Sequence, residues 1–246
     1  EHQDFVTPDF RFREIRAFVE RGLEDFSISR LASKMSWGVP VPGDEEQVMY
    51  VWFDALVNYI STLGWIDNQD QFEKFWVHGT PTQYCGKDNL RQQSATWQAM
   101  LMAAGIPNSH RIVINGFINA AGNVKMSKSL GNVVNPYDVV SEYGTDALRY
   151  HLCAHVTPFE DTPFTMESFK DAYNADLANG LGNITARLLA MADNYAVDVS
   201  VLDWDESRGT FADEHLEEFN LAGALKEIWH RLHTIDGTIA EVKPFI

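Results

Sequence analysis

The sequence contains little cysteine and no long apolar stretch. Cys85 and Cys153 are its only cysteines, too few and too far apart for a disulfide framework or a Cys-x-x-Cys metal site. No window reaches the roughly 18 consecutive apolar residues of a membrane-spanning helix, and residues 1–4 lack the basic flank and apolar core of a secretory signal. These absences argue against a membrane-spanning or exported protein, and we expect a cytoplasmic one.

Basic side chains are also scarce. The chain has 19 Lys and Arg against 35 Asp and Glu, a net charge of −16, which argues against a protein that grips nucleic acid over its whole surface. Residues 86–130 differ, because they hold five basic side chains and one acid, a balance of +4. Solvated surface lysines are the common cause of such a run, and an anionic small-molecule site is the alternative. Residues 165–246 hold six basic and fifteen acidic side chains, a balance of −9.

The first half of the chain alternates predicted helices and strands. Apolar spacing predicts a helix over 9–21, and two prolines and two glycines predict a loop over 36–44. The remaining elements expected here are a buried strand at 48–52, a helix at 54–63, a strand at 82–85, a helix at 89–104 and a strand at 111–115. Strands alternating with helices of this length indicate a mostly parallel sheet with right-handed crossovers.

The second half is predicted to be helical. Two short helices are expected to begin at Pro136 and Thr145. From Thr165 an apolar stripe runs at helical spacing through Phe169, Tyr173, Leu177, Leu181, Ile184, Leu188 and Met191. A second helical run is expected from about 213 to 235. The chain therefore reads as an α/β portion that leads, near residue 160, into an all-helical portion.

A lysine-rich segment at 125–129 is the strongest chemical signal. Its sequence, Lys-Met-Ser-Lys-Ser, offers two ammonium groups three residues apart with two hydroxyls and backbone N–H groups around them. Such a set can clamp a polyphosphate and neutralise charge that moves onto its leaving portion. Gly122, just upstream, would let the loop change shape.

This pentapeptide resembles the signature loop of class I aminoacyl-tRNA synthetases. Its surroundings narrow the resemblance to the methionyl-tRNA synthetase family. The segments that carry this likeness, in the family's order and across nearly the entire chain, lie at 27–30, 37–42, 50–56, 86–88, 116–117 and 144–150.

The resemblance implies a fold and its division. Residues 1–116 would be the second half of a Rossmann-type nucleotide-binding domain of a class I synthetase. Residues 117–160 would hold the lysine loop and a linking stem. Residues 161–246 would form the first helices of an incomplete all-α bundle that binds the anticodon.

The resemblance also implies a methionine–tRNA ligase. The carboxylate of methionine would attack the α-phosphorus of ATP, giving methionyl-adenylate and pyrophosphate, and the methionyl group would pass to tRNA-Met. Lys125 and Lys128 would stabilise the developing charge, and Mg²⁺ would share the neutralisation. The residues implied in ATP binding are Gly86, Asp88, Gly116, Lys125, Met126, Ser127, Lys128 and Ser129.

A second residue set matches the family's methionine site. Trp52, Ala55, Leu56, Tyr59, Gln93 and Arg30 make up this set. The first four are spaced i, i+3, i+4, i+7, which puts them on one helical face, and aromatic rings suit a polarizable thioether. Without the resemblance a core-facing stripe would be the better interpretation. We expect Asp54 to cap the following helix, and for Asp88 capping is the alternative to a contact with ribose.

Several family features are missing. None of the eight histidines lies in a His-x-Gly-His-like segment, and there is no cysteine cluster for a structural zinc. Gln93 and Asn115 stand where many relatives have His, and both can still form hydrogen bonds. The chain also does not begin with Met, so we expect a piece or one half of a longer enzyme, inactive without an amino-terminal partner. An inactive synthetase-like module that binds tRNA or protein, and a class I synthetase for another aliphatic amino acid, remain alternatives.

Overall fold

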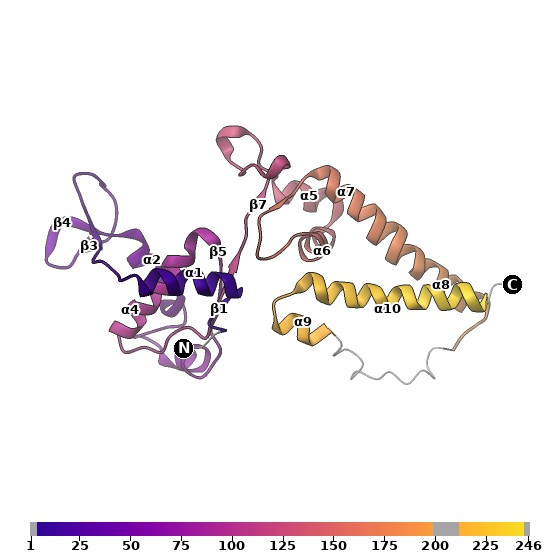
Figure 1. The fold of residues 1–246 in the computed structure, drawn as a ribbon, viewed down its shortest axis with the longest axis horizontal. Helices are drawn as coiled ribbons and strands as arrows, with labels where there is room; N and C mark the ends of the chain where they lie inside the picture. Colours follow the sequence, from indigo (N-terminus) through magenta and orange to yellow (C-terminus); the bar gives the residue numbers. More distant parts are fainter. Residues whose placement is uncertain (1–3, 199–211, 244–246) are drawn as a thin grey trace. The chain divides into compact units, whose positions relative to one another are not determined.

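The structure is a computed structural model that describes residues 4–198 and 212–243. The chain divides into two compact units, Glu1–Asn115 and Gly116–Ile246. Each unit is described separately below (Figure 1). None of the helices in the described ranges is both long and apolar enough to cross a membrane.

A small parallel sheet forms the centre of the first unit. Its strands are β1 (Val6–Thr7), β6 (Arg111–Asn115) and β5 (Thr82–Gly86), in that order. Both pairings are parallel, as the sequence predicts. β6 is the middle strand, and its residues 112–114 are at most 1% exposed. A strand covered on both faces is continuously apolar, and the sequence Ile-Val-Ile follows that rule.

Helices pack against this sheet. α1 (Asp9–Glu20) follows β1, and a continuous helical stretch follows β5 through η2 (Lys87–Asn89), η3 (Gln92–Thr96) and α4 (Trp97–Ala103). Both helices predicted here are confirmed, although the second is π-helical in its middle. The buried residues that join sheet and helices are Val6, Ile15, Leu90, Ile112 and Ile114.

A separate antiparallel sheet contradicts part of the prediction. β4 (Asp44–Met49) lies between β2 (Ser29–Leu31) and β3 (Pro40–Val41). The expected buried strand at 48–52 is wrong, because β4 ends at Met49 and does not join the parallel sheet. A short apolar run cannot by itself distinguish a strand from the first turn of a helix. The predicted loop at 36–44 contains β3, and Gly43 at φ 83° allows the turn into β4.

Helix α2 begins earlier than the sequence predicts. It spans Val51–Ser61 with Tyr50 at the N-cap, so the expected capping role of Asp54 is wrong. Asp54 lies in the first turn, where a carboxylate is still favourable near the positive end of the helix dipole. α2 packs against α3 (Gln69–Phe72), η1 (Glu73–Val77) and α4. The buried residues of this second core are Leu56, Ile60, Phe72, Trp76, Trp97 and Leu101.

The second unit begins with short elements. β7 (Ile118–Asn119) pairs in parallel with β8 (Thr162–Pro163), and the turns η4 (Ala121–Asn123) and η5 (Lys128–Leu130) lie between them in sequence. Helices α5 (Pro136–Tyr143) and α6 (Thr145–His155) begin where the sequence predicts.

A long helical rod follows. α7 (Met166–Ala172), η6 (Tyr173–Gly182) and α8 (Asn183–Asn194) run without interruption (Figure 1). Thr165 starts the rod through a reciprocal capping box with Ser168, which satisfies the first free N–H groups. The predicted helix from Thr165 is thus confirmed. Its stripe enters the third core at one end, where the buried residues are Val139, Ala147, Leu148, Phe164 and Phe169.

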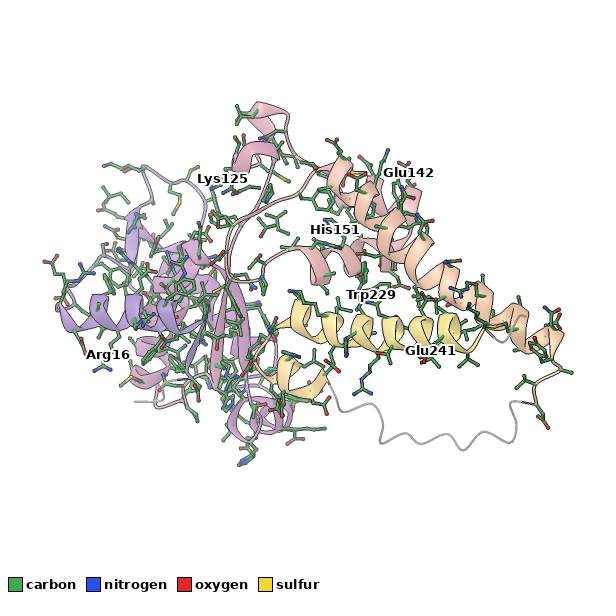
Figure 2. All side chains as sticks on the ribbon, turned by 45° about the vertical axis from the view of Figure 1, so that its right-hand side comes forward. Arg16, Lys125, Glu142, His151, Trp229 and Glu241 are labelled. Atoms are coloured by element: carbon green, nitrogen blue, oxygen red, sulfur yellow. The ribbon has the colours of Figure 1, made fainter. Side chains whose placement is uncertain are left out.

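The last helical run is broken. The sequence predicts one helix from 213 to 235, and the structure has α9 (Asp213–Glu217) followed by α10 (Leu221–Val242). Phe219 at φ 58° interrupts the helix, and the Asn220 side chain caps α10 by accepting from the Gly223 N–H at 2.9 Å. α10 contacts α6 through a hydrogen bond and the helical rod through an ion pair. The indole of Trp229, which Figure 2 labels on α10, donates to the Tyr150 hydroxyl at 2.6 Å. Arg187 of α8 pairs with Asp236 of α10.

Candidate functional site

The lysine segment forms a loop with a defined turn. Ser127 is extended, at φ −148° and ψ 147°, and the chain then enters the 3-10 turn η5. The Ser127 hydroxyl accepts from the Leu130 N–H at 3.3 Å, so the serine caps the turn that contains Lys128. Gly131 ends the turn in the left-handed conformation, at φ 64°. The loop's backbone is therefore organised by its own short polar side chains.

Apolar and cationic side chains of the loop have different surroundings. Met126 is partly buried and packs against the third core. Lys125 and Lys128 are both exposed, and the Lys125 ammonium lies 5.4 Å from the centre of the Phe117 ring (Figure 2). One apolar residue thus anchors a loop whose two ammonium groups are accessible to a solute.

Asn132 contacts the loop and was not singled out by the sequence. Its carbonyl oxygen accepts from the Ser127 N–H at 2.8 Å, and its amide donates to the Lys125 carbonyl at 3.2 Å. The only signal in the sequence is the preceding Gly131, since a glycine after a short turn often redirects the chain.

Gly116 has a structural reason to be glycine. A β-carbon there would lie 2.2 Å from the backbone of Glu160, and the Gly116 N–H donates to the Pro158 carbonyl at 3.0 Å. The close approach of residues 158–161 to this backbone requires the absence of a side chain. The next N–H, of Phe117, donates to the Asp161 carboxylate at 3.0 Å.

In the first unit, the four residues spaced along one helical face all lie on α2. Leu56 is 1% exposed and belongs to the second core, whereas Trp52 and Tyr59 are partly buried against that core. Ala55 is exposed. The stripe is therefore a packing face at Leu56, and its aromatic members form the edge of that packing.

A contact between α2 and η3 joins two of the predicted residues. The Gln93 amide donates to the Tyr59 hydroxyl at 2.8 Å, across 34 positions of sequence. Gln93 is 2% exposed, and its carbonyl oxygen has no hydrogen-bond partner among the described residues. Tyr59 also lies against Trp97, with ring centres 6.0 Å apart. A buried unpaired acceptor beside a phenol is a polar point in otherwise apolar surroundings.

Arg30 is held by local contacts. It lies on β2, exposed, with its guanidinium 4.3 Å from the centre of the Tyr50 ring. The same guanidinium donates to the carbonyls of Ser27 and Ser29 at 3.0 and 2.8 Å. Because Tyr50 is the N-cap of α2, Arg30 lies next to the start of the helix that carries Trp52.

Gly86 and Asp88 lie at the carboxyl end of the parallel sheet. Gly86 is the last residue of β5 and pairs in register with Asn115, the last residue of β6. Ligands of open α/β sheets commonly bind at this edge. Asp88 is exposed in η2, where Gly86 is the N-cap residue, so the structure does not use Asp88 as a cap. Burial, and secondly the charge of Asp88, raise the pKa of Cys85 to about 12, which makes that thiol a poor nucleophile.

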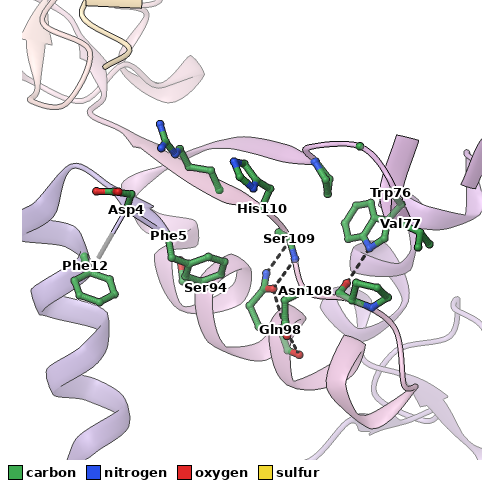
Figure 3. Close-up of a pocket in the computed structure, with 14 residues that line it drawn as sticks. Asp4, Phe5, Phe12, Trp76, Val77, Ser94, Gln98, Asn108, Ser109 and His110 are labelled. Atoms are coloured by element: carbon green, nitrogen blue, oxygen red, sulfur yellow. Dashed lines mark hydrogen bonds between the residues drawn. The ribbon is translucent and has the colours of Figure 1, made fainter. Parts of the chain in front are cut away.

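A cavity lies at the opposite edge of the parallel sheet, where the amino ends of β5 and β6 meet (Figure 3). It has a volume of about 880 Å³ and is lined by residues that include Pro81 and Arg111, at the amino ends of β5 and β6. The Gln98 amide is bonded there to Asn108 and Ser109, at 3.0 and 3.1 Å. None of the predicted site residues lines this cavity. The candidate functional regions are therefore two, each considered by itself: the lysine loop in the second unit and the α2–η3 face in the first.

Metal ligands do not cluster in the described ranges. Within residues 4–198 and 212–243, no group of three or more His, Cys, Asp or Glu side chains is placed to hold a metal ion.

Comparison with known proteins shows a consistent set of relatives. The family model "tRNA synthetases class I (M)" matches residues 3–189. A methionine–tRNA ligase of Thermosynechococcus vestitus is 44% identical over 201 residues, covering 79% of this chain and 37% of that protein. One of Fusobacterium nucleatum is 37% identical over 258 residues, covering the whole chain and 40% of that protein. The chain thus spans about 40% of these relatives' length.

Solved structures agree with the sequence relatives. The Mycobacterium tuberculosis methionyl-tRNA synthetase in complex with methionyl-adenylate matches with a TM-score of 0.85 and 33% identity, over 98% of this chain and 49% of that one. Its free form matches with a TM-score of 0.80 and 31% identity over the same shares. The mixed α/β fold with a parallel sheet is therefore a class I synthetase fold, and the chain belongs to the methionyl family of class I tRNA synthetases.

Proposed function

We propose that this chain supplies the triphosphate-binding loop and the methionine-recognition face of a methionine–tRNA ligase. The observation that carries the proposal is the lysine loop. Its two ammonium groups are exposed while Met126 and Ser127 hold its backbone, in a chain that matches the family model over residues 3–189. A solvated surface run of lysines would need no such anchoring.

In the proposed reaction, an oxygen of the methionine carboxylate attacks the α-phosphorus of ATP. The new O–P bond gives methionyl-adenylate, and pyrophosphate leaves with the electron pair of the broken bond. Lys125 and Lys128 stabilise the charge that develops on the leaving portion. Ser127, Ser129, Met126 and the backbone orient the loop around the phosphates. Mg²⁺ is expected to enter with ATP, bound by phosphate oxygens.

Methionine recognition is assigned to the first unit. The Tyr59 hydroxyl accepts its hydrogen bond from Gln93, so the phenolic proton is available to a weak acceptor such as a thioether. Trp52 offers an aromatic surface for sulfur, with Ala55 beside it and Leu56 beneath as packing. Arg30 lies on β2, with its guanidinium over the ring of Tyr50 at the start of α2, and it is proposed to lie near the bound methionine.

Nucleotide binding is assigned to the sheet edge and the glycines. Asp88 is proposed to accept from the ribose hydroxyls, since it is exposed next to the carboxyl end of β5. Gly86, the last residue of β5, and Gly116 are proposed to lie near the nucleotide, although the close approach of the Glu160 backbone already explains why residue 116 is glycine.

The remaining assignments follow from the family. Residues 1–116 are proposed as the second half of a Rossmann-type domain, 117–160 as the loop and stem, and 161–246 as the first helices of an anticodon-binding bundle. The partners are then tRNA-Met, methionine, ATP and the remaining part of the longer enzyme, in the cytoplasm where translation uses the product.

The test is methionine-dependent exchange between ATP and pyrophosphate. We expect negligible exchange by this chain alone and restored exchange when the segment that completes the relatives' length is added. Exchange driven by another aliphatic amino acid in place of methionine would reassign the substrate. Binding of tRNA without exchange in any combination would contradict the ligase function and favour a binding module.

A further inference from the structure

The structure assigns to Asn132 the positioning of the lysine loop. We propose that its side-chain amide, by bridging Lys125 and Ser127, holds the loop in the conformation that presents both ammonium groups. The value of that conformation for a triphosphate rests on the proposed function, but the bridge itself does not.

The bridge spans a single residue. The Lys125 carbonyl and the Ser127 N–H lie on either side of Met126, and Asn132 bonds to both, at 3.2 and 2.8 Å. Their roles are fixed, since a carbonyl only accepts and a backbone N–H only donates. The orientation of the Asn132 amide is therefore determined by its partners.

Only asparagine satisfies both partners at this length. An aspartate would keep the acceptor for Ser127 but would place a negative oxygen against the Lys125 carbonyl. An alanine would leave both backbone groups to water. Gly131, in the left-handed conformation, turns the chain so that the next residue reaches back to the loop.

The bridge complements two other supports of the loop. Met126 packs into the third core, and Ser127 caps the turn that begins at Lys128. The Ser127 hydroxyl fixes the turn that follows Met126, and Asn132 bonds to backbone groups on both sides of Met126. The backbone is therefore held before and after this apolar anchor. Loss of the bridge should free Lys125 first, because among the described residues the Asn132 amide is the one hydrogen-bond donor to the Lys125 carbonyl.

The rate of trypsin cleavage reports how readily the backbone of the lysine loop opens, because trypsin cuts after lysine and arginine. In the 246-residue chain we expect Asn132→Ala to raise the rate of cleavage after Lys125 and Lys128 about tenfold, relative to cleavage after the exposed Lys34. Asn132→Asp, which keeps one bond, should show a smaller increase. Mass spectrometry of timed digests gives the cleavage rates. If Asn132→Ala does not fold, the cleavage rates of Asn132→Asp alone test the bridge.

Asn135→Ala is the matched control. Asn135 caps α5 by accepting from the Tyr137 N–H at 3.2 Å, and its hydrogen bonds go to Tyr137 and Asp138 and not to the lysine segment. We expect it to lower thermal stability without changing cleavage in the loop. Wild-type cleavage rates in both Asn132 variants, or an equal increase in Asn135→Ala, would overturn the proposal.

A second readout separates this inference from the proposed function. In the complemented enzyme Asn132→Ala should raise KM for ATP about tenfold and leave KM for methionine unchanged. Faster cleavage with an unchanged KM for ATP would support the bridge and overturn the loop's role with the triphosphate.

Discussion

The lysine loop and the α2–η3 face hold their functional groups by different means. The loop uses short polar side chains that bond to backbone groups, namely Ser127 and Asn132, with one apolar anchor at Met126. The α2–η3 face uses a packed core of Leu56 and Trp97, on which one bond between Gln93 and Tyr59 is set. Under the proposed function, the loop presents mobile charges to a triphosphate, whereas the α2–η3 face must keep its shape to receive an apolar side chain. The difference predicts that substitutions in the loop change the rate constant of exchange or KM for ATP, whereas substitutions in the α2–η3 face change KM for methionine.

The largest expected effect is on the loop's charges. In the complemented enzyme, Lys125→Ala or Lys128→Ala should lower the rate constant of exchange by about 10²- to 10³-fold, because the proposed role of each lysine is to stabilise developing charge. KM for methionine should change little. Lys34→Ala, an exposed lysine outside the loop, is the control. An equal loss in this control would remove the distinction between loop and surface lysines.

The second effect is on the stability of the fold and concerns the close packing at Gly116. Gly116→Ala should destabilise the fold by about 1–3 kcal/mol, because its β-carbon would meet the Glu160 backbone at 2.2 Å. Gly237→Ala is a matched control in α10, where nothing lies within 4 Å of the added carbon. It should stabilise the helix by up to about 1 kcal/mol. Urea unfolding followed by circular dichroism measures both, and an unchanged Gly116→Ala midpoint would contradict the close approach.

The third effect concerns the buried amide in the first unit. Gln93→Ala should raise KM for methionine about tenfold, since it removes the bond that orients Tyr59. KM for ATP should stay the same, in contrast to the Asn132 variants. Gln92→Ala, at the preceding residue of η3, serves as the control. A rise in KM for ATP alone would show that the two regions do not divide the substrates as proposed.

The smallest effect is a pH dependence in the second unit. His151, labelled in Figure 2, is 5% exposed, and its Nδ1 has no partner in the described residues. Its ring meets the rings of Phe164 and Phe169 edge-on. Burial lowers its pKa, and the charge of His155, stacked 5.1 Å away, lowers it further, while Asp176 of η6 acts in the opposite direction.

The sign of this dependence follows from linkage. Because the folded-state pKa lies below that of the unfolded chain, the unfolded state binds the proton first as the pH falls. Stability should therefore decline below about pH 6.5, by at most about 1.4 kcal/mol per pH unit, until the folded pKa is passed. His151→Phe should reduce the slope of unfolding free energy against pH. An unchanged slope would exclude His151 as its cause.

Local patterns in the sequence predicted much of the second unit. The start of α5 depends on the Asn135 cap and the fixed backbone angle of Pro136, and α6 begins at Thr145 directly after Gly144 at φ 87°; these are properties of neighbouring residues. The break at Phe219 was missed, because its left-handed conformation has no marker in the sequence. The strand expected at 48–52 failed for a related reason, since the first turn of α2 continues the apolar run of β4.

The sequence alone determined the family, the lysine loop and the order of the main elements, because these depend on residue identity and on spacing along the chain. Only the tertiary structure brought Gln93 to Tyr59, set Asn132 across Met126 and placed Gly116 against Glu160. Such contacts depend on how distant or folded-back segments pack, and a hydrogen-bonding side chain carries no information about which backbone group will come within its reach.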